Sequence, residues 1–133
     1  MIKFFQGVTI VFLLFIIWII FSANTGGNNI FFEFVNWLPF GDKIGHFFLF
    51  GCLTLGVNFA FNFKKFTFWE VLPLGTFLVS VFVLIEELSQ GFLPNRTLDV
   101  ADLLADGLGI VSFTFIGNVL SKKGFFGLRV TNK

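Results

Sequence analysis

Residues 4–23 read FFQGVTIVFLLFIIWIIFSA, twenty positions without one charged side chain. An α-helix rises about 1.5 Å per residue, so a run of this length crosses the ~30 Å hydrocarbon core of a bilayer. Cleavage of the run as a signal peptide after Ala23 would place bulky Phe21 where small residues are favoured. We therefore expect this stretch to be a retained membrane-spanning helix.

Three further apolar runs follow along the chain, and each has a similar length. Lipid offers no partners to a bare backbone, so long apolar runs in a membrane form helices. The sequence thus predicts an all-α membrane protein, one domain over residues 1–133, with four transmembrane helices at about 4–23, 44–63, 71–88 and 100–120. Between the first two helices, IFFEFVNW at 30–37 is too short to span the bilayer. We expect it to form an interfacial or re-entrant segment.

The composition supports a membrane setting. Hydrophobic residues make up 56% of the chain and charged residues 13%, whereas soluble domains are near a quarter charged. The net charge of +1 argues against a nucleic-acid partner, because phosphate binding needs a basic face. A single cysteine, Cys52, excludes a disulfide framework and a thiolate metal cluster. Membrane lipids are therefore the first partners to expect.

Basic residues are distributed unequally between the two sides of the predicted membrane. Two of them, Lys43 and Arg96, fall on one side. The other side holds seven, namely Lys3, Lys64, Lys65, Lys122, Lys123, Arg129 and Lys133. Cytoplasmic segments carry the excess of Lys and Arg, so both termini are expected in the cytoplasm.

Most of the acidic residues gather at the outer ends of the second, third and fourth predicted helices. The six are Asp42, Glu86, Glu87, Asp99, Asp102 and Asp106, accompanied by Lys43, His46, Gln90 and Arg96. Each charge at membrane depth costs roughly 2.5–3.5 kcal/mol on insertion scales, and such groups usually line a polar cavity. The set has a formal charge of −4, and all of its members except Glu86 are predicted to form an outward-facing ligand-binding pocket.

Helical spacing places several of these residues on shared faces. The sets are Asp42 with His46, Glu87 with Gln90, and the stripe Asp99, Asp102 and Asp106. The helix N-terminus stabilises the negative charge of Asp99, but the mutual repulsion of the three carboxylates along the stripe still needs compensation. Lys43 or Arg96, a shared proton, a bound divalent metal or a cationic ligand would each supply it. The stripe therefore provides candidate metal ligands, and His46, Glu87 and Asp102 are candidate catalytic groups.

Three charged side chains have simpler alternative roles. Arg96 either grips an anionic ligand or forms an internal salt bridge to Asp99 or Asp102. Lys43 either binds the ligand or extends to the interface. Glu86 points about 100° away from Glu87 on the helix, so we expect it to extend outward. Gly51, Gly56, Gly107, Gly109 and Gly117 are expected to allow close helix packing.

Two segments resemble the motifs of a bacterial family. The first is Asp42-Lys43-Ile44-Gly45-His46-Phe47 with Phe50 and Leu53, and the second comprises Glu87-Leu88-Ser89-Gln90, Pro94, Arg96, Asp99, Asp102, Asp106 and Gly109. Together they are similar to the VanZ-like membrane proteins, over about residues 39–117. The resemblance implies a multi-pass protein of the bacterial cytoplasmic (inner) membrane and a cell-envelope role associated with teicoplanin-type glycopeptide resistance. Two positions differ from the family pattern. This chain has Asp106 where the family more often has asparagine, and Phe113 where it often has glycine.

Three functions are compatible with this sequence. The favoured one is non-enzymatic binding of a lipid headgroup, a lipid-linked wall precursor or a glycopeptide in the polar pocket. The second is a metal-dependent enzyme acting on a phosphorylated or diphosphate lipid, with His46 as general acid or base. The third is a proton-coupled transporter, which would have to oligomerise because four helices enclose only a narrow pathway.

Overall fold

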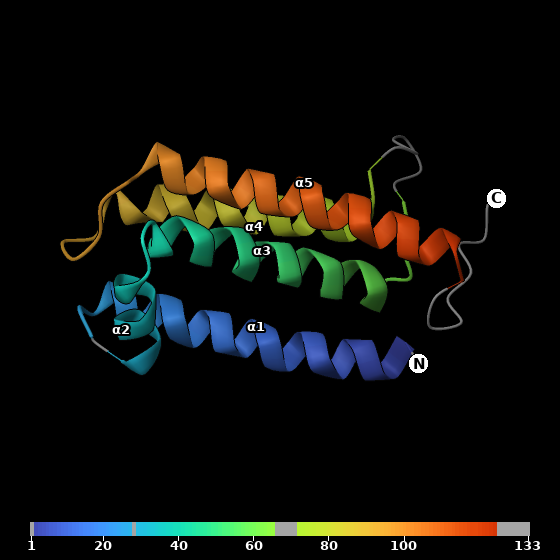
Figure 1. The fold of residues 1–133 in the computed structure, drawn as a ribbon, viewed down its shortest axis with the longest axis horizontal. Helices are drawn as coiled ribbons and strands as arrows, with labels where there is room; N and C mark the ends of the chain where they lie inside the picture. Colours follow the sequence, from blue (N-terminus) through green and yellow to red (C-terminus); the bar gives the residue numbers. More distant parts are fainter. Residues whose placement is uncertain (1, 28, 66–71, 125–133) are drawn as a thin grey trace.

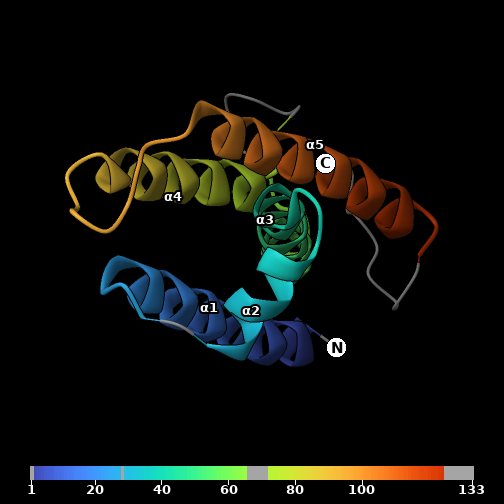
Figure 2. The same cartoon turned by 60° about the vertical axis from the view of Figure 1, so that its left-hand side comes forward.

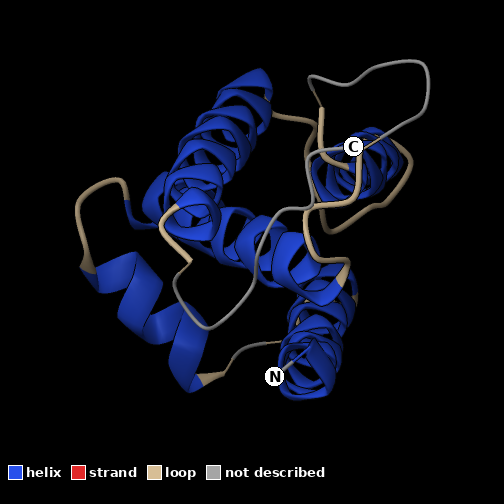
Figure 3. Ribbon diagram, turned by 90° about the vertical axis from the view of Figure 1, so that its right-hand side faces the viewer, coloured by secondary structure: helices blue, strands red, loops and turns tan. Residues whose placement is uncertain are grey.

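The computed structural model of the chain describes residues 2–27, 29–65 and 72–124, and these contain helices without strands (Figures 1 and 3). The helices are α1 (Ile2–Asn24), α2 (Ile30–Trp37), α3 (Gly41–Ala60), α4 (Leu74–Gln90) and α5 (Val100–Lys122). The predicted all-α class is confirmed for this part of the chain.

Three of the described helices are long and apolar enough to cross a membrane, namely α1, α3 and α5. Helix α4 has 17 residues, or about 25 Å, which is the lower end of the range for a spanning helix. Three of the four predicted transmembrane helices therefore meet the requirement, and the crossing by α4 stays a prediction.

Large apolar side chains cover the outside of the long helices. Among the most exposed are Val11 and Leu14 on α1 and Leu104, Leu108, Val111 and Phe115 on α5. An apolar surface of this extent is unfavourable in water and suits contact with lipid. Together with the three long helices, it indicates a multi-pass membrane protein.

The predicted boundaries of the second transmembrane helix were wrong at both ends. Helix α3 begins at Gly41 instead of residue 44, so Asp42 and Lys43 lie in its first turn. It ends at Ala60 instead of residue 63 because Asn62 and Phe63 adopt left-handed backbone angles, with φ of 52° and 54°.

The predicted third transmembrane helix also begins later than expected. Helix α4 starts at Leu74, directly after Pro73, whose missing N–H is no loss at a helix start. Val71, the predicted first residue, lies outside the described residues, as do Arg129 and Lys133 of the charge count.

The predicted interfacial or re-entrant segment forms the short helix α2. The side chain of Asn29 caps it, accepting a hydrogen bond from the Phe32 N–H at 3.0 Å. Eight residues rise only about 12 Å, so α2 cannot span a bilayer. It packs against α3 beside the far end of α1 (Figure 1).

Helix α3 lies at the centre of the fold and contacts the other four helices, α5 most extensively (Figure 2). Its Phe50 and Leu53 form a core with Ile16, Val79, Val83 and Ile110. Helices α1 and α4 both pack on α3 but have at most marginal contact with each other. The two helices therefore flank a gap whose floor is α3.

Close contacts at glycines explain how α3 and its neighbours approach. A methyl group at Gly109 would overlap the backbone of Phe47, and one at Gly51 would overlap the ring of Phe113. Gly56 and Gly117 are also tightly packed, so four of the five predicted packing glycines are confirmed. The prediction was wrong for Gly107, which faces open space.

Candidate ligand-binding site

The charged residues meet at one end of the bundle, which we call the α2 end. It consists of α2, the start of α3, the end of α4 and the start of α5 (left in Figure 1). The six acidic residues predicted to gather do so here, on three different helices and at the α5 cap. Helices α3 and α5 run away from this end and α4 runs toward it. The starts of α3 and α5 therefore lie next to the end of α4, which brings the acidic residues together.

Lys43 is the hub of the more exposed part of the cluster. Its ammonium group donates to one carboxylate oxygen on each of three aspartates, Asp42 (2.7 Å), Asp99 (3.1 Å) and Asp102 (2.8 Å). Lys43 thus links the first turn of α3 to the first turn of α5, instead of extending freely to the interface. One cation partly compensates three carboxylates.

Asp99 has a second role as the N-cap of α5. Its Oδ1 accepts a hydrogen bond from the Ala101 N–H at 2.9 Å, as expected for a helix N-terminus. The hydrogen bond from Lys43 is the main cause that holds the pKa of the Asp99 carboxyl below its usual range. Asp99 therefore stays ionised over the physiological pH range.

His46 and Asp106 form a pair one turn deeper in the bundle. His46 Nδ1 and Asp106 Oδ1 are hydrogen-bonded at 2.8 Å, and the Asp106 side chain is completely buried. The other ring nitrogen, Nε2, lies 3.8 Å from Asp102 Oδ2, beyond hydrogen-bond distance. An ionised Asp106 only accepts, so it would hold the proton on Nδ1 and leave Nε2 as the basic or ligating nitrogen.

Two adjacent glutamates at the end of α4 are buried beside this pair. Glu87 has no exposed surface, and its oxygens accept from Gln90 Nε2 and from the Asp99 N–H, both at the long distance of 3.2 Å. The second contact joins the end of α4 to the N-cap of α5. Gln90 Nε2 also donates to both oxygens of Glu86 at 2.9 Å.

One predicted side-chain placement was wrong, and one of the two alternatives for Arg96, the internal salt bridge, is not observed. Glu86 does not extend outward but is buried, with 7% exposure, and Gln90 and Arg96 lie next to its carboxylate. Arg96 on that loop lies 3.9 Å from Glu86 and donates to Asn24 Oδ1 at 3.1 Å, so it forms no salt bridge with Asp99 or Asp102. Lys43 occupies those two aspartates instead.

These groups surround a polar cavity of about 610 Å³ at the α2 end. Its charged and polar wall includes Asp42, His46, Glu86, Asn95, Arg96 and Asp102. Its apolar wall comes from α1, α2 and α3, with Ile16, Ile20, Phe31, Phe32, Leu49 and Phe50. A cavity of this size and mixed lining suits an amphipathic ligand.

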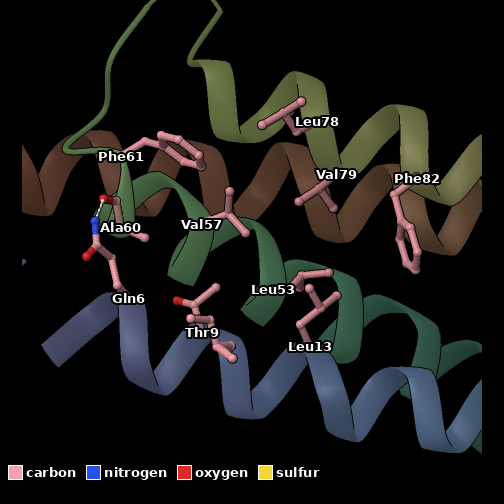
Figure 4. A pocket seen from close by; sticks show the side chains of 11 residues that line it. Gln6, Thr9, Leu13, Leu53, Val57, Ala60, Phe61, Leu78, Val79 and Phe82 are labelled. Carbon is pink, nitrogen blue, oxygen red and sulfur yellow. Dashed lines mark hydrogen bonds between the residues drawn. The ribbon is translucent and has the colours of Figure 1, made fainter. Parts of the chain in front are cut away.

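A second cavity of about 450 Å³ lies further along the same gap between α1 and α4 (Figure 4). Thr9 and Leu13 of α1 face Leu78, Val79 and Phe82 of α4 across the α3 side chains Leu53 and Val57. Its lining contains no charged side chain, and the side-chain amide of Gln6 donates a hydrogen bond to the Ala60 carbonyl at 3.3 Å. We call it the apolar cavity.

The predicted metal stripe is divided in the structure. Asp99 and Asp102 share the Lys43 ammonium, whereas Asp106 turns to His46. Among the described residues, the acidic and histidine groups that lie within reach of one ion are instead His46, Glu87 and Asp106, whose ligand atoms are all within 4.8 Å of one another.

Sequence reasoning missed two groups of polar residues. Asn24, at the end of α1, orients Arg96 through its side chain. Further from the α2 end, Asn58 and Thr76 exchange hydrogen bonds of 2.8 and 3.0 Å, and Thr76 bonds to Thr114 at 2.8 Å. A lone asparagine inside an apolar run was the available signal for the second group, since buried amides need partners.

Comparison with known proteins finds no matching family model, no matching curated protein and no matching solved structure. The resemblance to VanZ-like proteins therefore rests on the two motifs alone.

Proposed function

We propose that this protein binds an anionic envelope lipid, with the headgroup in the polar cavity and the hydrocarbon chain along the gap between α1 and α4. In this proposal α4 is the fourth membrane crossing, both termini are cytoplasmic, and the polar cavity faces the outer leaflet of the bacterial cytoplasmic membrane. The observation that supports this proposal is that a charged cavity and an apolar cavity lie one after the other between the same two helices.

Arg96 is the group best suited to the anionic headgroup. It lines the polar cavity, and only NH1 forms a hydrogen bond among the described residues, while NH2 is 3.9 Å from Glu86. A guanidinium has five N–H donors, so several remain for a phosphate or carboxylate. The acidic wall formed by Asp42 and Asp102 suits an amine or hydroxyl groups on the same ligand.

The length of the gap suits a lipid chain. His46 in the polar cavity and Val57 in the apolar cavity are eleven residues apart on α3, which is about 16 Å of helix. One leaflet of a ~30 Å hydrocarbon core is about 15 Å thick. A hydrocarbon chain that descends from the headgroup would therefore reach the apolar cavity and pack against its walls.

The resemblance to VanZ-like proteins indicates which class of lipid to propose as the ligand. A lipid-linked wall precursor carries both a phosphate and a hydrocarbon chain, and it is the ligand that would connect the pocket to glycopeptide resistance. A phospholipid headgroup offers the same chemistry. Native mass spectrometry of the protein extracted with its lipids would identify which of these classes is retained.

The test uses a fluorescent anionic phospholipid and the detergent-purified full chain. Arg96→Gln removes the headgroup cation, and we expect binding at least about tenfold weaker, equal to about 1.4 kcal/mol. Lys64→Gln is the matched control, since Lys64 is exposed beyond the end of α3, away from the polar cavity. Equal affinities of both variants and the wild type would contradict the proposal.

A second candidate function is an enzyme acting on a phosphorylated lipid. The observation that favours it is the His46–Asp106 pair, which leaves the second ring nitrogen available on a residue that lines the polar cavity. Such a pairing orients a general base. Release of phosphate or diphosphate from a bound lipid, lost in His46→Gln, would support the enzyme, and unchanged lipid would support binding alone.

A further inference from the structure

The three buried groups His46, Glu87 and Asp106 come from three different helices. His46 is on α3, Glu87 on α4 and Asp106 on α5. Both carboxylates are completely buried, and ligand atoms of all three residues lie within 4.8 Å of one another. Glu87 and Asp106 do not line the polar cavity, so this group lies behind its wall, with His46 shared between the two.

The electrostatics of the group are unbalanced. Among the described residues, neither Glu87 nor Asp106 forms an ion pair with Lys or Arg. Lys43 is held by three other aspartates, and Arg96 faces Glu86. With a neutral imidazole, the two carboxylates leave a formal charge of −2 in a buried space, where an uncompensated charge is costly.

A second observation points to a missing partner. Asp106 Oδ2 is buried and has no hydrogen-bond partner among the described residues, although Oδ1 of the same carboxylate binds His46. Buried carboxylate oxygens are normally satisfied by donors or by a cation. The orphaned oxygen therefore belongs to the same side chain that the geometry assigns to a coordination site.

We propose that His46, Glu87 and Asp106 bind one divalent transition-metal ion, with Zn²⁺ as the best match. One imidazole nitrogen with two carboxylate oxygens suits Zn²⁺ better than Mg²⁺ or Ca²⁺, which prefer oxygen ligands alone. Its charge cancels the −2 excess. Three protein ligands leave the fourth tetrahedral position for water or for an oxygen of a ligand in the polar cavity.

Binding of the ion requires a local rearrangement of the three side chains. Ligand atoms of a tetrahedral zinc site at bond lengths near 2.1 Å are about 3.4 Å apart. The present group spans up to 4.8 Å, and the 2.8 Å hydrogen bond between His46 Nδ1 and Asp106 Oδ1 would have to lose its proton and open for both of these atoms to bind the ion. Rotation of the Glu87 side chain, whose two hydrogen bonds are both long at 3.2 Å, would complete the set.

This inference does not depend on lipid binding, so its test is done without lipid. The detergent-purified full chain is treated with a chelator and titrated with Zn²⁺ by calorimetry and with Co²⁺ by visible absorption. We expect one equivalent to bind and a tetrahedral cobalt spectrum. Glu87→Gln and Asp106→Asn should each weaken binding by more than the 10–100-fold typical of an outer-shell partner, whereas Glu33→Gln on exposed α2 should bind like the wild type.

Two results would overturn the proposal. One is the absence of Zn²⁺ and Co²⁺ binding in a folded, monodisperse wild-type sample, which would mean that a proton satisfies the carboxylates. The other is loss of binding in Asp99→Asn with full binding in Glu87→Gln, which would move the site to the aspartate stripe. Circular dichroism of each variant separates loss of the site from loss of the fold.

Discussion

The polar and apolar cavities are lined by the same three helices, α1, α3 and α4, yet their chemistry is opposite. Both are bounded by α1 on one side, α4 on the other and α3 beneath. Only the polar cavity also receives residues from α2, from the α4–α5 loop and from α5, and these additions include Arg96 and Asp102. The difference shows that the charged side chains of the polar cavity come from the helix ends and loop at the α2 end, whereas the gap between α1 and α4 is lined mainly by apolar side chains further along.

Helix α5 lines the polar cavity but not the apolar cavity. We expect the largest effect on stability and headgroup binding from a substitution that moves this helix. Gly109→Ala would force α5 away from the Phe47 backbone just below the polar cavity. We expect a loss of about 1–3 kcal/mol of stability, as for other overpacked sites, together with weaker headgroup binding. Thermal unfolding in detergent measures the first effect and lipid binding the second.

Gly107→Ala is the matched control for that substitution, because a methyl group there meets nothing within 4 Å. Alanine is the better helix former, so this variant should be as stable as the wild type or up to about 1 kcal/mol more stable. Similar destabilisation by both substitutions would show that the α3–α5 contact is not the critical one.

A substitution inside the apolar cavity tests whether hydrocarbon occupies it. Leu13→Trp fills the space between α1 and α4, and we expect about tenfold weaker binding of a long-chain phospholipid. A short-chain analogue with the same headgroup should bind as it does to the wild type. Leu14→Trp, one residue along and exposed on the outer face of α1, is the control and should change neither affinity.

Removing a fixed charge at the rim of the α2 end should give the smallest effect. The folded-state pKa of Asp99 is below its ordinary value, so its ionised form contributes stability above about pH 4, and this is lost as the pH falls through the folded pKa. Asn retains the N-cap, so Asp99→Asn removes the charge and the ion pair with Lys43. Its melting temperature should be slightly lower than that of the wild type at pH 7, and the difference should shrink as the pH falls below about 4. A difference that does not change with pH would contradict the assignment.

The sequence was sufficient for the helices and for the gathering of charge, because both depend on local patterns. Apolar runs fix where helices lie, and spacing fixes which acids share a face, as for Asp99, Asp102 and Asp106. Hydropathy did not locate the ends of α3, since these depend on left-handed backbone angles at Phe40, Asn62 and Phe63. The charged first turn of α3 therefore appeared to precede the helix.

Pairing between helices was not predictable, because it depends on the rotation of each helix about its axis. Arg96 is closer in sequence to Asp99, but the loop directs it toward Asn24 and Glu86. Lys43, 56 residues away from Asp99, reaches that aspartate instead. The same rotation brings Asp106 to His46 and separates it from the other two members of its stripe.

The most direct test of the central claim is photo-crosslinking with two versions of one anionic phospholipid, carrying the reactive group on the headgroup or near the chain end. We predict that the headgroup probe labels the polar cavity at Phe31 and Leu49, and that the chain probe labels the apolar cavity at Leu13, Val57 and Leu78. Labelling by both probes spread over the outward-facing residues Leu14, Val111 and Phe115, without enrichment in either cavity, would contradict the account.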